Sequence, residues 1–219
     1  TLAAAKFLYL DDLENVGILA HVEASRLLAS GDATGAAEVM RNWMFFSRQM
    51  CDRPFLKEKK FGMGSMGMAL ERIADIVYTD FRSPTHSIQP SRLVNAIGNF
   101  RDRSLYIDRI RLPEAEFVAR EQLISRVIIE KGGPNPQTFA STMARVSSVD
   151  RPLRLFSAAA YWEQIRPRHV GWYDAQKVLN SLKADWDQHW KLSPFDVFQQ
   201  RQTYFKLYVK DRPRYAVIG

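Results

Sequence analysis

The sequence predicts an all-α protein, on three observations. Apolar residues recur at spacings of three and four along most of the 219 residues, which is the period of an amphipathic helix. The breaks between these runs carry helix-capping residues, glycine or proline. No convincing period-two alternation appears between turn signals, although two short pieces, 105–112 and 215–218, are ambiguous. We therefore expect irregular antiparallel helical hairpins, partly solenoid and tetratricopeptide-like.

The first two helices are predicted from two amphipathic runs on either side of Gly31. Glycine at this position suits the residue that follows a helix C-terminus, and Asp32 or Thr34 can cap the next helix. Because so few residues separate the runs, the two helices are expected to pack antiparallel. The expected apolar positions are Leu13, Val16, Leu19, Ala20, Leu27 and Leu28 in the first helix, and Ala36, Ala37, Val39, Met40, Trp43, Met44 and Phe46 in the second.

Three further helices are expected between Asp52 and Gly132. Asp52 and Pro54 provide a cap and a first-turn proline for a third helix that runs to Phe81. After a proline-containing loop, apolar positions predict a fourth helix over 93–100. Pro113 then opens a fifth helix.

Residues 132–136 are the best candidate for a domain boundary. Two glycines and two prolines in five residues cannot continue a helix. They divide the chain into a helical-hairpin region, 1–131, and a C-terminal helical region, 132–219, which we expect to pack as one continuous unit. Within the second region, helices are predicted over 139–146, 153–165, 170–190 and 195–209.

Composition and charge are those of a folded globular protein. Hydrophobic residues make up 46% of the chain and charged residues 25%, so a packed core is expected throughout. The net charge is +7, but the 24 acidic residues are interspersed with the 31 basic ones. This mixture favours a solvated surface, with nucleic acid or an anionic membrane as the alternative partner. The single cysteine, Cys51, excludes an internal disulfide.

No motif in the sequence predicts catalysis, a cofactor or a metal. Gly62, Gly64 and Gly67 match the phosphate-binding pattern GxGxxG, but the hydrophobic strand that should precede it is replaced by charged residues. Small residues at helical spacing that let another helix come close, or a locally loosened helix, explain these glycines better. The four histidines are far apart and form no zinc-binding pair, and no Gly-x-Ser-x-Gly elbow is present.

Aromatic residues gather towards the C-terminus, where Trp186 and Trp190 share one helix face. Packing is the first interpretation of these side chains. The alternative is a partner surface, because tryptophan, tyrosine and arginine dominate interface hot spots. The candidate interaction surface comprises Trp186, Trp190, Arg201, Tyr204, Lys206, Tyr208 and Lys210.

Between Ala20 and Pro113 the order of signals resembles that of uncharacterised helical proteins abundant in planctomycetes. These signals are Gly31-Asp32, Gly35-Ala36-Ala37, the segment Arg-Gln-Met-Cys-Asp-Arg-Pro-Phe-Leu at 48–56, and Leu112-Pro113. The resemblance implies a tetratricopeptide-like first hairpin and a non-enzymatic domain. It also implies an extracytoplasmic or membrane-associated place, with any anchor outside this chain. It carries no catalytic residues over to the present sequence.

These observations lead to three hypotheses of function. The first is a non-enzymatic helical interaction or structural subunit of a larger assembly, either membrane-associated or not, whose partners are other protein subunits. The second is a basic helical module that binds nucleic acid or anionic lipid. The third is a helical enzyme without a recognisable motif.

Overall fold

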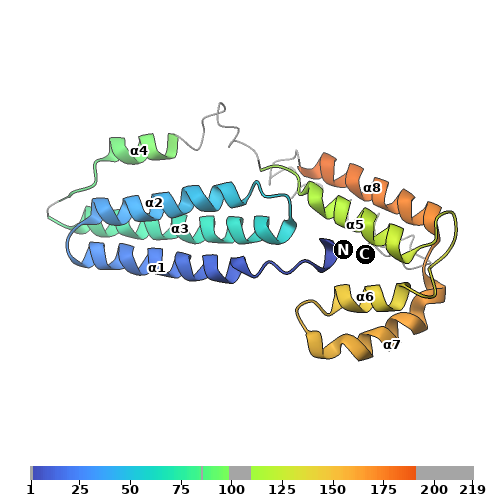
Figure 1. Ribbon diagram of the computed structural model, residues 1–219. Helices are drawn as coiled ribbons and strands as arrows, with labels where there is room; N and C mark the ends of the chain where they lie inside the picture. Colours follow the sequence, from blue (N-terminus) through green and yellow to red (C-terminus); the bar gives the residue numbers. More distant parts are fainter. Residues whose placement is uncertain (1, 85, 99–109, 191–219) are drawn as a thin grey trace. The chain divides into compact units, whose positions relative to one another are not determined.

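The computed structural model describes residues 2–84, 86–98 and 110–190, and all regular elements among them are helices (Figure 1). The prediction of an all-α protein is therefore confirmed. An isolated bridge between Ile128 and Pro134 is the one strand-like pairing in this part of the chain. The elements are η1 (Leu2–Ala4), α1 (Tyr9–Ala29), α2 (Ala33–Met50), α3 (Leu56–Arg82), α4 (Pro90–Gly98), α5 (Glu114–Val127), α6 (Phe139–Ser147), η4 (Pro152–Arg154), α7 (Leu155–Ile165), η5 (Arg166–Arg168) and α8 (Trp172–Trp190).

The chain forms two compact units. One comprises Phe7–Pro113, and the other combines Thr1–Lys6 with the residues from Glu114 onward. The glycine and proline turn at 132–136 ends α5 but lies within the second unit, because its backbone is tied to neighbouring segments. The amide of Asn135 donates to the carbonyl of Val127 at 2.7 Å, and the amide of Trp172 donates to the carbonyl of Gly132 at 2.8 Å.

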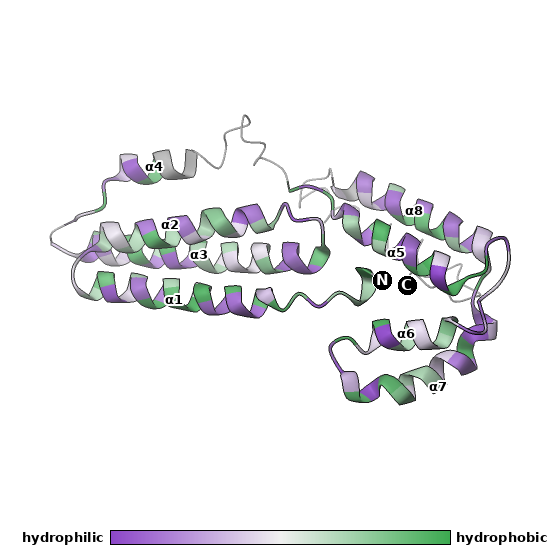
Figure 2. Cartoon of the chain, viewed as in Figure 1, coloured by the Kyte–Doolittle hydropathy of each residue, from purple (hydrophilic) through white to green (hydrophobic). Residues whose placement is uncertain are grey.

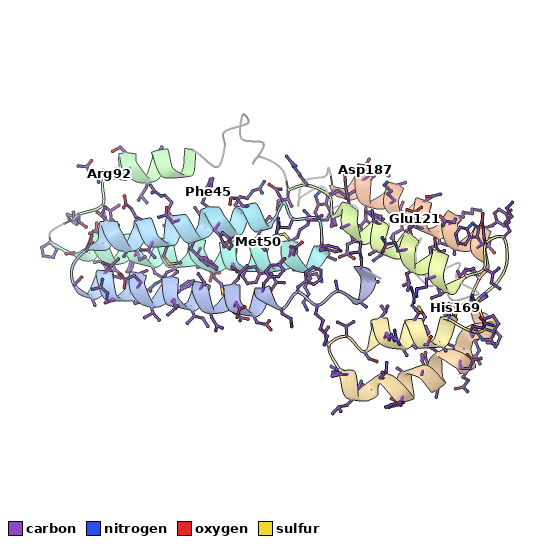
Figure 3. All side chains as sticks on the ribbon, viewed as in Figure 1. Phe45, Met50, Arg92, Glu121, His169 and Asp187 are labelled. Atoms are coloured by element: carbon purple, nitrogen blue, oxygen red, sulfur yellow. The ribbon has the colours of Figure 1, made fainter. Side chains whose placement is uncertain are left out.

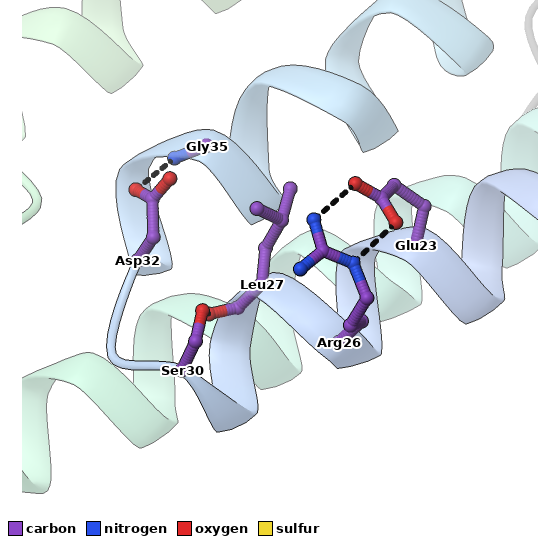
Figure 4. A network of polar contacts seen from close by, with 6 residues as sticks. All are labelled: Glu23, Arg26, Leu27, Ser30, Asp32 and Gly35. Atoms are coloured by element: carbon purple, nitrogen blue, oxygen red, sulfur yellow. Dashed lines mark hydrogen bonds and ion pairs between the residues drawn. The ribbon is translucent and has the colours of Figure 1, made fainter.

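The α1–α2 turn has the cap chemistry that its sequence predicts. Gly31 has a φ of +88°, and the amide of Asp32 donates to the carbonyl of Leu27 at 2.9 Å, as in a Schellman motif. The Asp32 carboxylate then accepts a 2.8 Å hydrogen bond from the amide of Gly35, so that Asp32 is the cap of α2 (Figure 4). The turn of the expected hairpin is therefore formed by Gly31 and Asp32, as the sequence predicts.

The start of α3 differs from the expectation. Its N-cap is Phe55, whose amide donates to the carboxylate of Glu58 at 3.3 Å, so that Asp52 does not cap this helix and Pro54 lies before it. The Asp52 carboxylate is engaged elsewhere. It pairs with Arg48 at 2.9 Å and accepts from the amide of Arg111 at 3.2 Å.

The core of the first unit is formed by small and flexible side chains between α1, α2 and α3. Gly62 is the point of closest approach, since a Cβ there would lie 2.7 Å from the backbone nitrogen of Cys51 and the carbonyl oxygen of Ser47. The close approach expected of the glycines is therefore found at Gly62, in an uninterrupted helix. The buried cluster comprises Ala24, Ala33, Ala36, Met40, Trp43, Met44, Ala69 and Ile76.

The inner face of α1 matches the expected one only in part: Ala20, Leu27 and Leu28 pack against the core as predicted. The buried residues of α1 are Leu10, Gly17 and Ala24, which follow one another at intervals of seven. Val16 and Leu19, which were expected on the inner face, are largely exposed, because they lie to one side of this line. The apolar residues of α1 therefore exceed what its packing against the other helices uses.

The second unit is formed by α5, α8 and the α6–α7 hairpin. Phe117, Ile124 and Val127 of α5 are buried, and so is Phe139 of α6. The indole of Trp162 in α7 donates to the hydroxyl of Ser147 at 3.0 Å, which ties the two helices of the hairpin together. The expected helices over 139–146, 153–165 and 170–190 are confirmed, whereas 195–209 lies outside the described residues.

Candidate functional site

The expected interaction surface near the C-terminus is described at its two tryptophans. The rings of Trp186 and Trp190 are stacked, with centroids 6.2 Å apart. Trp186 also meets Phe117 edge-on at 5.4 Å and lies beneath the guanidinium of Arg120. Trp186 therefore helps to hold α8 against α5. The other members, Arg201, Tyr204, Lys206, Tyr208 and Lys210, lie outside the described residues.

The glycine motif that was weighed as a phosphate site lies within a regular helix. Gly62, Gly64 and Gly67 lie inside α3, where the backbone amides are used in helical hydrogen bonds and form no loop around a phosphate. Among the residues that the structure describes, no group of three or more histidine, cysteine, aspartate or glutamate side chains could hold a metal ion.

An apolar groove of the first unit is bordered by α1, α2 and α3 and has a volume of about 460 Å³. Ile18 on α1 and Met68 on α3 stand at its rim, and each is 55% exposed. Figure 2 shows that hydrophobic positions recur along α1. The lining residues are Glu14, Gly17, Ile18, His21, Val22, Ser25, Trp43, Ser65 and Met68.

The floor of the groove depends on a glycine beneath a tryptophan. Trp43 of α2 is buried, and its ring lies against Gly17, where a Cβ would come within 2.7 Å of the indole. Phe46 stacks on the same indole at 5.3 Å. Because the indole fills the space that a side chain at position 17 would need, α1 lies directly on α2 and the floor of the groove is apolar.

The polar groups of the groove stand along α1 and at one end of it. The guanidinium of Arg72 donates to the hydroxyl of Ser25 at 2.7 Å. Burial, and secondly the positive charge of Arg72, lowers the pKa of His21, so that its imidazole is neutral at pH 7. Glu14 lies on α1 about three turns before Ser25. The groove therefore has an apolar middle and the Glu14 carboxylate at one end. At the other end, beyond the lining residue Ser25, lies the guanidinium of Arg72, which is also 4.0 Å from the carboxylate of Asp75.

A cluster of buried ionisable groups closes the α2–α3 turn. Lys59 is fully buried, and its ammonium donates to the carbonyl of Cys51 at 2.7 Å, at the C-terminus of α2. Burial lowers the pKa of Lys59, and the carboxylate of Asp52 opposes this shift. A cation on the last carbonyls of a helix is favourable. We interpret Lys59 as a structural group.

Two residues of this cluster, Tyr9 and Cys51, have raised pKa values, which favour their protonated forms. Burial, together with a hydrogen bond to Glu58, raises the pKa of Tyr9 to about 12. Burial also raises the pKa of the Cys51 thiol, which donates to the carbonyl of Ser47 at 3.3 Å. A buried, protonated thiol is a poor nucleophile. The cluster therefore joins the start of α1 to the α2–α3 turn and offers no activated group.

His169 lies between η5 and α8 in the second unit and is buried (Figure 3). Its ring lies 4.8 Å from Phe139 and 5.8 Å from Trp162, centroid to centroid. Burial lowers its pKa. The imidazole is thus part of an aromatic core and is held in its neutral form.

This burial predicts a pH-dependent stability. The unfolded chain, with a histidine pKa near 6.5, takes up the proton first. The contribution of His169 to the free energy of unfolding should therefore fall as the pH drops below about 6.5, by at most about 1.4 kcal/mol per pH unit, and level off below the folded-state pKa. His21, whose pKa is also lowered, adds a slope of the same sign. Denaturant titrations between neutral and acidic pH would measure this slope. His169→Phe should reduce it, and an unchanged slope in that variant would contradict a buried neutral imidazole.

Comparisons with known proteins leave the site to be interpreted by its own chemistry. No protein-family model matches the chain, and no curated protein or solved structure matches it either. Within the described residues, no helix has the length and apolar character needed to cross a bilayer. The chemistry of the groove and its residues is therefore what bears on function.

The groove was not among the features predicted from the sequence. Its signal was present in α1, where Val16, Ile18, Leu19 and Val22 extend the apolar surface beyond one packing face. An apolar arc wider than a two-helix contact needs indicates either a second buried contact or an exposed one. The sequence could not distinguish these two cases.

Proposed function

We propose that the chain is a non-enzymatic helical interaction module of a larger assembly, which binds an amphipathic helix of a partner protein in the α1–α3 groove. In this proposal α1 and α2 act as a tetratricopeptide-like hairpin, with α3 completing the binding surface. The observation that carries it is the apolar groove of about 460 Å³ with Ile18, Val22 and Met68 exposed at its rim. Helix-in-groove binding uses this combination of an apolar floor and open sides.

The open rim favours a helix over an enclosed small molecule. Small-molecule sites bury roughly 70–90% of their ligand. Here both rim residues with the largest side chains, Ile18 and Met68, are more than half exposed, so that a ligand between them would keep one side in water. An amphipathic helix has one apolar side to bury and one polar side to leave exposed. Met68 also adapts its shape readily to such a partner.

The length and charge of the groove support the same ligand and predict its orientation. From Glu14 to Ser25 the groove follows α1 for roughly three turns, or about 16 Å. A helix has a partial positive charge at its N-terminus and a partial negative charge at its C-terminus. We therefore expect the N-terminus of the bound helix near Glu14 and its C-terminus near Arg72.

A selection experiment tests the proposal. Displayed peptides of about 15 residues, helical and with aliphatic side chains at i, i+3, i+4 and i+7, would be selected against the full chain. Fluorescence anisotropy then gives the Kd of the best peptide for the chain and its variants. Ile18→Glu combined with Met68→Glu should weaken binding by about 30-fold or more, because it places two charges in the apolar contact.

The matched control is Tyr78→Glu combined with Phe81→Glu. Both residues are exposed on α3, but neither lines the groove. This variant has the same change of charge and should leave the Kd within about twofold. Equal weakening in the two double variants, or selected peptides indifferent to both, would remove the groove as the docking site.

A further inference from the structure

Two large apolar side chains protrude from the second unit, at the turn that connects α6 to α7. Leu153 in η4 is 97% exposed, and Phe156 in the first turn of α7 is 86% exposed. Such exposure leaves almost the whole of each side chain in water. Burying both would be strongly favourable, so this turn is the most apolar projection that the described part of the second unit offers.

The same apolar surface continues along α7. Ala160 follows Phe156 at helical spacing and is exposed, and Tyr161 is more than half exposed beside it. The opposite side of α7 is fixed to α6, since the indole of Trp162 donates to Ser147. Figure 2 shows the hydrophobic positions of α7. The helix therefore carries an outward apolar stripe on a rigid hairpin.

Arginines surround this stripe. Between positions 145 and 168 the chain has five arginines against two carboxylates. Arg145, Arg151 and Arg154 are exposed. One of the two carboxylates, Glu163, is already paired with Arg166 at 2.9 Å. The surroundings of the apolar residues are therefore positively charged.

We propose that the turn between α6 and α7 binds the surface of an anionic lipid bilayer, with Leu153 and Phe156 inserted below the phosphates. Arg151 and Arg154, on either side of Leu153, would then contact the lipid headgroups. Apolar side chains provide insertion and flanking arginines provide attraction to anionic lipid, and stable attachment of a peripheral protein needs both. The charge surplus favours a membrane over a protein partner, whose surface would have to be acidic to match. This site is separate from the helix-binding groove and extends the proposed function.

Vesicle binding by the full chain tests this proposal. Sedimentation would compare vesicles of phosphatidylcholine alone with vesicles containing about 25% phosphatidylserine, at about 0.15 M salt. We expect saturable binding to the anionic vesicles. Leu153→Ser combined with Phe156→Ser should weaken it by roughly 100-fold, because two inserted side chains are lost. This variant leaves the net charge unchanged, so that any contribution of the basic residues at 201–214 is the same in both proteins.

Two control variants make the outcome specific. Val118→Ser combined with Tyr173→Ser removes exposed apolar side chains elsewhere in the same unit, and should leave binding unchanged. Arg151→Glu combined with Arg154→Glu should weaken binding to the anionic vesicles and reduce its dependence on salt. Absence of anionic-vesicle binding, or binding that survives Leu153→Ser with Phe156→Ser, would overturn the proposal. So would a soluble protein partner that is lost with the same variant while vesicle binding persists.

Discussion

Gly62→Ala should destabilise the unit Phe7–Pro113 by roughly 2–4 kcal/mol, although alanine is the better helix former. The new Cβ would lie 2.7 Å from the nitrogen of Cys51 and the oxygen of Ser47. Both are backbone atoms, which cannot rotate away as a side chain can. The C-terminal turn of α2 would have to move off α3, together with the hydrogen bond between Lys59 and Cys51. Urea denaturation followed by circular dichroism measures the loss.

Gly64→Ala is the matched control for this prediction. It lies in the same helix, one residue beyond Met63, and a Cβ there would meet nothing within 4 Å. Replacing this glycine should stabilise the helix by about 0.5–1 kcal/mol, since alanine loses less backbone entropy on folding. The two variants are therefore expected to differ in sign. If both stabilise the protein, α2 and α3 do not approach each other at Gly62.

Trp43→Ala has the second large expected effect, a loss of about 3–5 kcal/mol. The indole is buried in the core, where it stacks on Phe46 and lies against Gly17. Its removal therefore leaves a cavity between these residues. The same change removes the floor of the groove, and helix binding should weaken in proportion. Phe45→Ala provides the control on the neighbouring position of α2, where the side chain is partly exposed (Figure 3).

For Phe45→Ala we expect a loss of no more than about 1.5 kcal/mol, because the phenyl ring already has part of its surface in water. Thermal or chemical denaturation of both variants, under the same conditions, gives the comparison. Equal losses would mean that the indole is not the centre of the packing between α1 and α2.

Much of the helical framework could be predicted because its signals are local. Gly31 and Asp32 determine the first turn by backbone conformation and side-chain capping, and both act as expected. Asp52 does not act as the predicted helix cap, because its carboxylate pairs with Arg48 and accepts from the amide of Arg111, which is distant in sequence. A capping motif that competes with a long-range partner cannot be assigned from the sequence alone.

The groove could not be predicted for a related reason. The sequence shows that α1 has an apolar side, but which of its residues are buried depends on the contact with the other helices. The buried residues are Leu10, Gly17 and Ala24. The decisive residue, Gly17, has no side chain to enter an apolar pattern. Its importance comes from Trp43, which lies on another helix. Trp186, by contrast, was predicted to pack or to dock, and its contacts with Phe117 and Arg120 give it a packing role.

Methyl nuclear magnetic resonance of the full chain, with labelled isoleucine and methionine, tests the docking groove most directly. Ile18 and Ile129 are a matched pair in one spectrum, 55% and 51% exposed, and only Ile18 lines the groove. On addition of the selected helical peptide, we expect saturable shifts of the Ile18 and Met68 methyl signals, with the Ile129 signals unchanged. Shifts at Ile129 without shifts at Ile18 and Met68 would contradict the claim that this groove binds a partner helix.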